Sequence, residues 1–378
     1  MFFNISLNFQ KNYPCHWQLG KFRVSTDPGW ELVQIGTSEI LYKGYADSSP
    51  LENLFTEIIA QDEPKITGNF CALVLTDGEL KIKTDRYRSF PIYVIPGNPV
   101  YIDPNYINNL IPTKDILWSN NLVTIHADHT MTGGKFDLVG SADLPTSTVD
   151  QIDELLTKKI QSFVSHNKLP LRVFLSGGVD TLLVYSYLRR LNAEHELIWY
   201  LHTDLDEFYL ANSGDLKNYW AYNQIHHWKE PCVLASGAPG DEFMLRNPVT
   251  GNQYLLGHRT SIPEQLIAQP KCLHHAHFTK SFKKFEGQVS ATFEELCNIT
   301  VNDWQHWHLG NTLTWTPLRD LELFKLFLAL PYETALGQIM DSAVSRVLIE
   351  RNVPGLTKVL SSQKNAGNGL QNLQSLLT

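Results

Sequence analysis

The chain has 378 residues, of which 43% are hydrophobic and 19% charged, a composition typical of a globular protein with a large core. The net charge of -8 argues against a broad nucleic-acid-binding face, so we expect no nucleic-acid partner. The five cysteines form no CxxC pair, which argues against a disulfide framework. We also expect a cytoplasmic protein with no membrane partner, because no apolar run approaches the roughly 20 residues that cross a bilayer and no signal peptide is recognisable.

The pattern up to residue 145 predicts an antiparallel, sheet-rich α+β domain. Segments that alternate or run apolar between turn residues cover 2–8, 21–27, 30–46, 71–85 and 90–96. Asp77-Gly78 predicts a two-residue hairpin turn, because this pair accepts the positive φ angles that such a turn needs. One helix is expected over residues 50–61.

The pattern changes after the Ser/Thr/Asp/Pro-rich stretch at residues 141–149. A helix with regularly spaced apolar residues is expected over 148–166. Beyond it, strands at 171–175, 196–201 and 231–236 alternate with helices at 180–191 and 215–228. This alternation predicts an α/β domain over 146–378 built on a doubly wound parallel sheet. The last hundred residues read as helical, including 318–330 and 333–352.

The strand at 171–175 ends in Ser176-Gly177-Gly178, and Asp180 and Thr181 follow in the first turn of a helix. Backbone N–H groups and the helix dipole at such a turn favour an anion. A carboxylate beside an anion indicates a cation between them, and Mg²⁺ bound to phosphate oxygens is the usual case. The plain alternative is a tight turn with no ligand. No GxxxxGK[ST] pattern occurs, which excludes a Walker-type phosphate loop.

A second stretch repeats this arrangement. The strand at 231–236 ends in Ser236-Gly237, and Asp241-Glu242 open the next helix. The carboxyl ends of parallel strands lie at one edge of the sheet, so we expect Asp180 and Asp241 to share one magnesium ion. The alternative for Asp241 is an ordinary acidic first turn of a helix.

These motifs resemble those of the asparagine synthetase family. SGGVDT (176–181) is similar to the pyrophosphate loop of N-type ATP pyrophosphatases, and SGAPGDE (236–242) to the SGxGxDE signature of the asparagine synthetase branch. Residues 314–331 resemble the family's PFLD segment, and 361–370 its lysine-bearing loop. Residues 68–94 resemble the G-x-F…RDR-x-G-x-x-PLYY stretch of the class II glutamine amidotransferase domain that precedes the synthetase domain in this family.

The resemblance implies a fold and an activity. The first domain would be an Ntn-hydrolase-like sandwich, and the second an adenine nucleotide alpha hydrolase-like domain with a helical C-terminal part. The enzyme would be an ATP-dependent, AMP-forming C–N ligase with ATP and Mg²⁺. It would convert a small-molecule or peptide carboxylate to an acyl-adenylate, releasing pyrophosphate, and an amine or ammonia would then displace AMP.

The resemblance also assigns roles to single residues. Pyrophosphate would be bound by Ser176, Gly177, Gly178 and Thr181, and Mg²⁺ by Asp180 and Asp241. Lys364 would add positive charge near the α-phosphate, although it also reads as a solvated lysine. Adenosine would contact Leu175, Tyr200 or Leu201, Ser236 and Gly237.

Two departures limit what the resemblance implies. Glutamine hydrolysis in this family needs an N-terminal cysteine, whereas this chain begins Met1-Phe2 and Cys15 lacks the free α-amine. We therefore expect no glutaminase, and a first domain that packs, forms a homodimer or binds something else. Arg88-Ser89 also stands where the motif has glycine.

The second departure is Ala238, which stands where asparagine synthetases have glutamate and β-lactam-forming relatives tyrosine. A methyl group cannot take a proton from the amine, so the base is another residue, the substrate or absent. The alternatives are a non-catalytic ATP-binding relative and another ATP pyrophosphatase, such as a tRNA thiolase or GMP-forming amidase.

Overall fold

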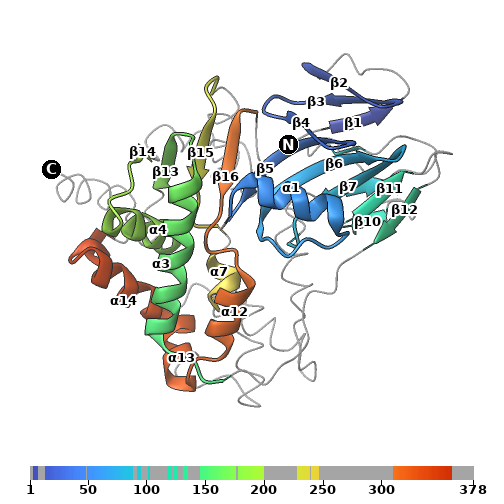
Figure 1. Cartoon of the computed structure of the whole chain (residues 1–378). Helices are drawn as coiled ribbons and strands as arrows, with labels where there is room; N and C mark the ends of the chain where they lie inside the picture. The colour runs from blue at the N-terminus through green and yellow to red at the C-terminus, as the bar shows by residue number, and fades with distance from the viewer. Residues whose placement is uncertain are drawn as a thin grey trace, which may run out of the picture.

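The computed structural model describes residues 3–6, 13–47, 49–87, 92–94, 101–102, 117–120, 122–125, 131–134, 145–175, 178–199, 228–238, 240–246 and 310–359. Within these residues the chain is a mixed α/β protein, with antiparallel sheets in the first part and a parallel sheet in the second (Figure 1). The two predicted kinds of sheet are thus confirmed. That the parts are separate domains over 1–145 and 146–378 stays a prediction.

Two antiparallel sheets make up the first part. One has the order β10-β8-β9-β1-β3-β2, and the other the order β12-β11-β7-β6-β5-β4. Their strands are β1 (Phe3–Ser6), β2 (Cys15–Leu19), β3 (Phe22–Thr26), β4 (Glu31–Ile35), β5 (Ser38–Ala46), β6 (Gly68–Thr76), β7 (Glu79–Thr84), β8 (Ile92–Val94), β9 (Tyr101–Ile102), β10 (Leu117–Asn120), β11 (Leu122–Ile125) and β12 (Met131–Gly134).

Helix α1 (Leu51–Ala60), predicted over residues 50–61, covers one face of the second sheet. Its buried Leu54, Phe55 and Ile58 pack against alternate residues of β5 such as Ile40 and Tyr42. The predicted hairpin turn is also confirmed: Asp77 and Gly78, between β6 and β7, have φ angles of 52° and 82°. The segment that forms β2 was not predicted, because its inward-facing side contributes one fully buried residue, Leu19.

The second part is built on a parallel sheet. Its strands β13 (Leu171–Leu175), β14 (Glu196–Trp199), β15 (Cys232–Ala235) and β16 (Thr312–Trp315) lie in the order β14-β13-β15-β16. Every neighbouring pair is parallel. The order of the strands reverses between β13 and β15, the position at which open α/β sheets bind ligands.

Helices α3 (Val149–His166) and α4 (Val179–Arg190) agree with the predicted ones. Thr148 and Gln151 form a capping box that starts α3. Of the helix predicted over 215–228, residues 215–227 lie outside the described residues. The crossover from β14 to β15 is therefore not described in full, and the doubly wound character stays a prediction.

The C-terminal region differs from the prediction in two ways. Strand β16 was expected to be helical, but its short Thr-Leu-Thr-Trp segment pairs with β15. The single helix expected over 333–352 is two helices, α13 (Tyr332–Asp341) and α14 (Ala343–Asn352), because Ser342 between them has φ 55°. The other elements of this region are α7 (Gly240–Phe243), α12 (Leu321–Leu328) and the 3₁₀ helix η2 (Leu356–Val359).

Strand β16 lies beside β5, where buried hydrogen bonds join the two parts (Figure 1). Lys43 Nζ donates to the Gly310 carbonyl at 2.5 Å, and the Thr316 amide donates to Tyr45 Oη at 3.1 Å. Arg319 Nη2 donates to the Tyr87 carbonyl at 2.7 Å. The antiparallel part therefore supports the edge strand of the parallel sheet.

Candidate functional site

The two turns singled out in the sequence meet at the carboxyl edge of β13 and β15. Gly237, after β15, packs against the first turn of α4: a methyl group there would lie 2.4 Å from the Thr181 nitrogen and 2.5 Å from the Asp180 carbonyl carbon. A methyl group at Gly240 would lie 2.6 Å from Asp180 Cγ. Real Cβ atoms do not approach other atoms so closely. Gly237 therefore has to be glycine for this contact with backbone atoms, whereas a methyl group at Gly240 would require the Asp180 side chain to move.

Hydrogen bonds of its own backbone shape the second turn. The Ser236 amide donates to the Trp315 carbonyl at 2.8 Å, and the Ala238 amide donates to Ser236 Oγ at 3.2 Å. The Gly240 amide donates to the Gly237 carbonyl at 2.9 Å and leads into α7. Ser236 thus organises the turn, while the Ala238 methyl group supplies no base there.

The first turn begins α4 without a side-chain cap. Gly178 precedes the helix with φ -75° and ψ 154°. Thr181 Oγ1 donates to the Gly178 carbonyl at 3.0 Å, so its hydroxyl would have to rotate before donating to a phosphate oxygen. Ser176 and Gly177 lie outside the described residues.

Both predicted metal-binding acids contact one cation, Arg246. Its Nη1 atom forms an ion pair with Asp180 Oδ1 and another, at 3.0 Å, with Asp241 Oδ1. Asp180 and Arg246 are 20% and 19% exposed, so this pair is shielded from water, whereas Asp241 is 50% exposed. Arg246 was missed in the sequence, because no pattern there marks it as a partner of the two acids.

A strained residue aims Arg246 at the acids. Leu245 is fully buried and has φ 60°, a left-handed conformation that is rare for a large side chain. This turns the chain back over α7, so that the Arg246 amide donates to the Asp241 carbonyl at 2.8 Å. Gln338 Nε2 donates a hydrogen bond at 3.1 Å to the carbonyl of Met244, the residue before Leu245.

The residues present fit a magnesium ion. The two carboxylate oxygens already converge on one cationic nitrogen, and Mg²⁺ is usually held by one or two carboxylates, phosphate oxygens and water. Among the described residues no group of three or more His, Cys, Asp or Glu could hold a metal.

Of the other residues predicted to contact the ligand, the structure describes only some. Leu175 ends β13 opposite Trp199, and its side chain is buried in the core. Tyr200, Leu201 and Lys364 lie outside the described residues, as do Met1, Phe2, Arg88 and Ser89. Their roles stay predictions.

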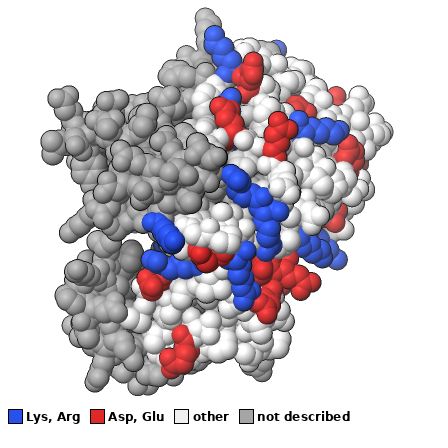
Figure 2. All heavy atoms as spheres, turned by 90° about the vertical axis from the view of Figure 1, so that its left-hand side faces the viewer, with Lys and Arg blue, Asp and Glu red and all other residues white. Residues whose placement is uncertain are grey.

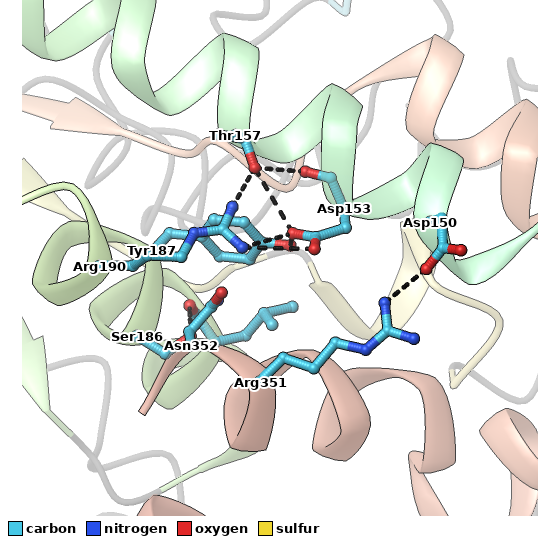
Figure 3. Close-up of polar contacts among 9 residues, drawn as sticks. Asp150, Asp153, Thr157, Ser186, Tyr187, Arg190, Arg351 and Asn352 are labelled. Atoms are coloured by element: carbon cyan, nitrogen blue, oxygen red, sulfur yellow. Dashed lines mark hydrogen bonds and ion pairs between the residues drawn. The ribbon is translucent and has the colours of Figure 1, made fainter. Parts of the chain in front are cut away.

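Polar contacts fix the position of α4 (Figure 3). Arg190, at its last position, forms an ion pair with Asp153 of α3 at 3.0 Å and donates to Thr157, and Tyr187 Oη donates to Asp153 at 2.8 Å. Asn352 of α14 donates to Ser186 Oγ at 3.0 Å. These contacts hold the helix whose amino end carries Asp180.

Cys15 is poorly suited to act as a nucleophile. It is a free, partly exposed thiol at the start of β2. Burial and, next, the negative charge of Asp27 raise the pKa of this thiol, which disfavours the reactive thiolate.

The face that carries α4 and α14 has no continuous charge of one sign: basic side chains alternate with acidic ones over its described part (Figure 2). Two ion pairs of this region are Arg346–Asp341 at 3.3 Å and Arg351–Asp150 at 2.6 Å. No described helix has the length and apolar composition needed to cross a membrane.

Comparisons with known proteins leave the family open. No protein-family model matches the chain, and no curated protein matches it. One solved structure with some likeness is glutamine phosphoribosylpyrophosphate amidotransferase from B. subtilis, complexed with ADP and GMP. The match has 10% sequence identity and a TM-score of 0.21, and covers 60% of this chain and 63% of that one. Such a match carries no argument, so the asparagine synthetase resemblance rests on the sequence motifs.

Proposed function

We propose that this chain is an ATP-dependent ligase that forms an amide by way of an acyl-adenylate. The observation that supports this most is the meeting of the two turns, in which Gly237 and Gly240 pack on the start of α4 and bring Asp180 and Asp241 around one cation. That edge of the sheet, beside the reversal of strand order, is where α/β proteins bind nucleotides.

Each residue has a role in this proposal. The start of α4, with Gly178 and Thr181 joined by Ser176 and Gly177, would bind the ATP phosphates. Asp180 and Asp241 would hold Mg²⁺, which offsets the negative charge of the departing pyrophosphate. The backbone of Leu175, together with Tyr200, Ser236 and Gly237, would bind adenosine. Lys364 would lie near the α-phosphate.

The second half of the reaction lacks an obvious protein base. The amine must lose a proton as the C–N bond forms and AMP leaves, and Ala238 cannot accept it. We propose that the nucleophile arrives as free ammonia or as a neutral amine, and that the proton released on C–N bond formation passes to water. Glutamine is not the donor in this proposal, because the raised pKa of Cys15 disfavours a thiolate nucleophile there.

One observation favours the alternative, a non-catalytic ATP-binding relative. Arg246 pairs with both acids and supplies the positive charge that a metal would otherwise bring. In that alternative the arginine is a permanent replacement for the metal. A tRNA-modifying relative is less well supported, because the net charge of the chain is -8.

The reaction products separate the two candidates. The protein is incubated with ATP, MgCl₂, ammonium and a pool of amino acids, and AMP plus pyrophosphate are separated from ADP plus phosphate. Asp180→Asn serves as the blank, because it keeps the size of the side chain and removes its charge. AMP and pyrophosphate above the blank support the ligase. ATP binding without turnover over a wide range of carboxylates supports the binding protein.

A further inference from the structure

We propose that Arg246 is a displaceable latch on the metal site: it holds Asp180 and Asp241 together until Mg²⁺ arrives, and then releases them. The inference rests on the metal site of the proposed function, and it assigns a regulatory role to a residue outside the sequence motifs. The juxtaposition that carries it is one guanidinium nitrogen in contact with both carboxylates.

Charge explains why the latch is needed. Two carboxylates that converge on one point repel each other unless a cation lies between them. Arg246 supplies one positive charge, and it contacts both acids. Mg²⁺ supplies two, and it therefore competes with the guanidinium for the same oxygens.

The local backbone suits a side chain that is held and then released. The Arg246 amide stays bound to the Asp241 carbonyl, so the backbone remains beside the site when the side chain moves. The strained φ of Leu245 sets the direction of Arg246. Once released, the guanidinium would remain next to the start of α4, where it can pair with a phosphate oxygen of the bound nucleotide.

The competition has a measurable size. A hydrogen bond between charged groups contributes enough free energy to change an equilibrium constant by about 10-fold to 100-fold. Removing the guanidinium should therefore tighten Mg²⁺ binding by about 10-fold or more.

The experiment is a calorimetric titration with MgCl₂ alone on the full chain. The variants are the wild type, Arg246→Gln and the double variant Arg246→Gln/Asp180→Asn. Arg172→Gln is a matched control, because Arg172 pairs with Glu196 at 2.8 Å in the same sheet and is 23% exposed. We expect tighter binding in Arg246→Gln, no change in Arg172→Gln, and loss of binding in the double variant. Binding in Arg246→Gln that is equal to or weaker than the wild type, including none in either, overturns the latch.

A second measurement uses the wild type, in case Arg246→Gln does not fold. The side-chain NMR signal of Arg246, assigned with Arg246→Lys, should shift when MgCl₂ is added, because the guanidinium leaves its carboxylates. A signal that stays unchanged while Mg²⁺ binds, or no Mg²⁺ binding at all, overturns the proposal. The ligase proposal is tested separately. Formation of AMP and pyrophosphate without the change in Mg²⁺ affinity contradicts only the latch. The change in Mg²⁺ affinity without formation of AMP and pyrophosphate contradicts only the ligase.

Discussion

Single residues decide whether the candidate site can form. Gly240 is packed so closely on Asp180 that a methyl group would lie 2.6 Å from its Cγ and 2.9 Å from Leu318 Cδ1. We predict that Gly240→Ala weakens Mg²⁺ binding, because the Asp180 side chain has to move, and lowers the free energy of unfolding by about 1 kcal/mol, the low end of the cost of overpacking. Urea unfolding and an MgCl₂ titration measure the two effects. Gly337→Ala is the control, because a methyl group there meets only Ala343 Cβ at 3.3 Å, and an unaffected Gly240→Ala would refute the packing argument.

The sequence predicted that Asp180 and Asp241 lie close together, but it did not predict the geometry that joins them. Asp180 and Asp241 could be paired in advance, because two strand ends of one parallel sheet carry the same Ser-Gly-acid order. Arg246 could not, since its position depends on the left-handed Leu245, and leucine carries no sequence signal for that conformation.

At the scale of elements, the contact between α3 and α4 sets where the amino end of α4 lies. Arg190 bonds both Asp153 and Thr157, and is 29% exposed. We predict that Arg190→Ala destabilises the protein by about 1–3 kcal/mol, because it leaves a partly buried carboxylate without its cation. A double-mutant cycle with Asp153→Ala isolates the pair.

The matching pair on the surface is Arg346–Asp341, at 3.3 Å with both side chains exposed. Its double-mutant cycle should give a coupling of about 0–1 kcal/mol. If the coupling energies of the two pairs are equal, the Arg190–Asp153 pair does not fix the position of α4.

Elements were predicted well where local signals are strong. Thr148 with Gln151 starts α3, and Asp77-Gly78 forms the turn between β6 and β7, because capping and turn chemistry act within a few residues. Strands β2, β9, β10, β11, β12 and β16 were missed, because each has only two to five residues, too few for a clear alternating pattern. The break at Ser342 was missed because serine gives no warning of a left-handed φ.

At the scale of the whole molecule, the junction between the antiparallel and parallel sheets is a buried polar layer. Lys43 donates to Asp27 at 2.9 Å and to the carbonyls of Pro28 and Gly310. Burial lowers the pKa of Lys43, while Asp27 opposes that shift. We predict that Lys43→Met costs about 3–5 kcal/mol, because it leaves Asp27 buried without its cation. Denaturant unfolding measures this, and a loss below about 1 kcal/mol would contradict it.

Asp47 gives this junction a pH dependence. It is buried near Lys159 and Asp320, and burial raises its pKa above that of a free carboxyl, more than Lys159 lowers it. The folded protein therefore keeps a proton that the unfolded chain loses, so the stability from this group is largest in acid and is lost as the pH rises through the folded pKa. We predict that Asp47→Asn loses less stability than the wild type between acid and neutral pH. Parallel slopes in urea unfolding across that interval would rule this out.

Both candidate functions, the ligase and the non-catalytic relative, require that ATP binds at the carboxyl edge of β13 and β15, where the two turns meet. The most direct test is the ATP affinity of the wild type and of Gly237→Ala in MgCl₂, with Gly337→Ala as the control. A methyl group at Gly237 would lie 2.4 Å from the Thr181 nitrogen, so the turns must separate. We predict that the wild type and the control bind ATP, and that Gly237→Ala binds it at least about 10-fold more weakly. Equal affinity in all three proteins, or no binding by the wild type, would contradict the account.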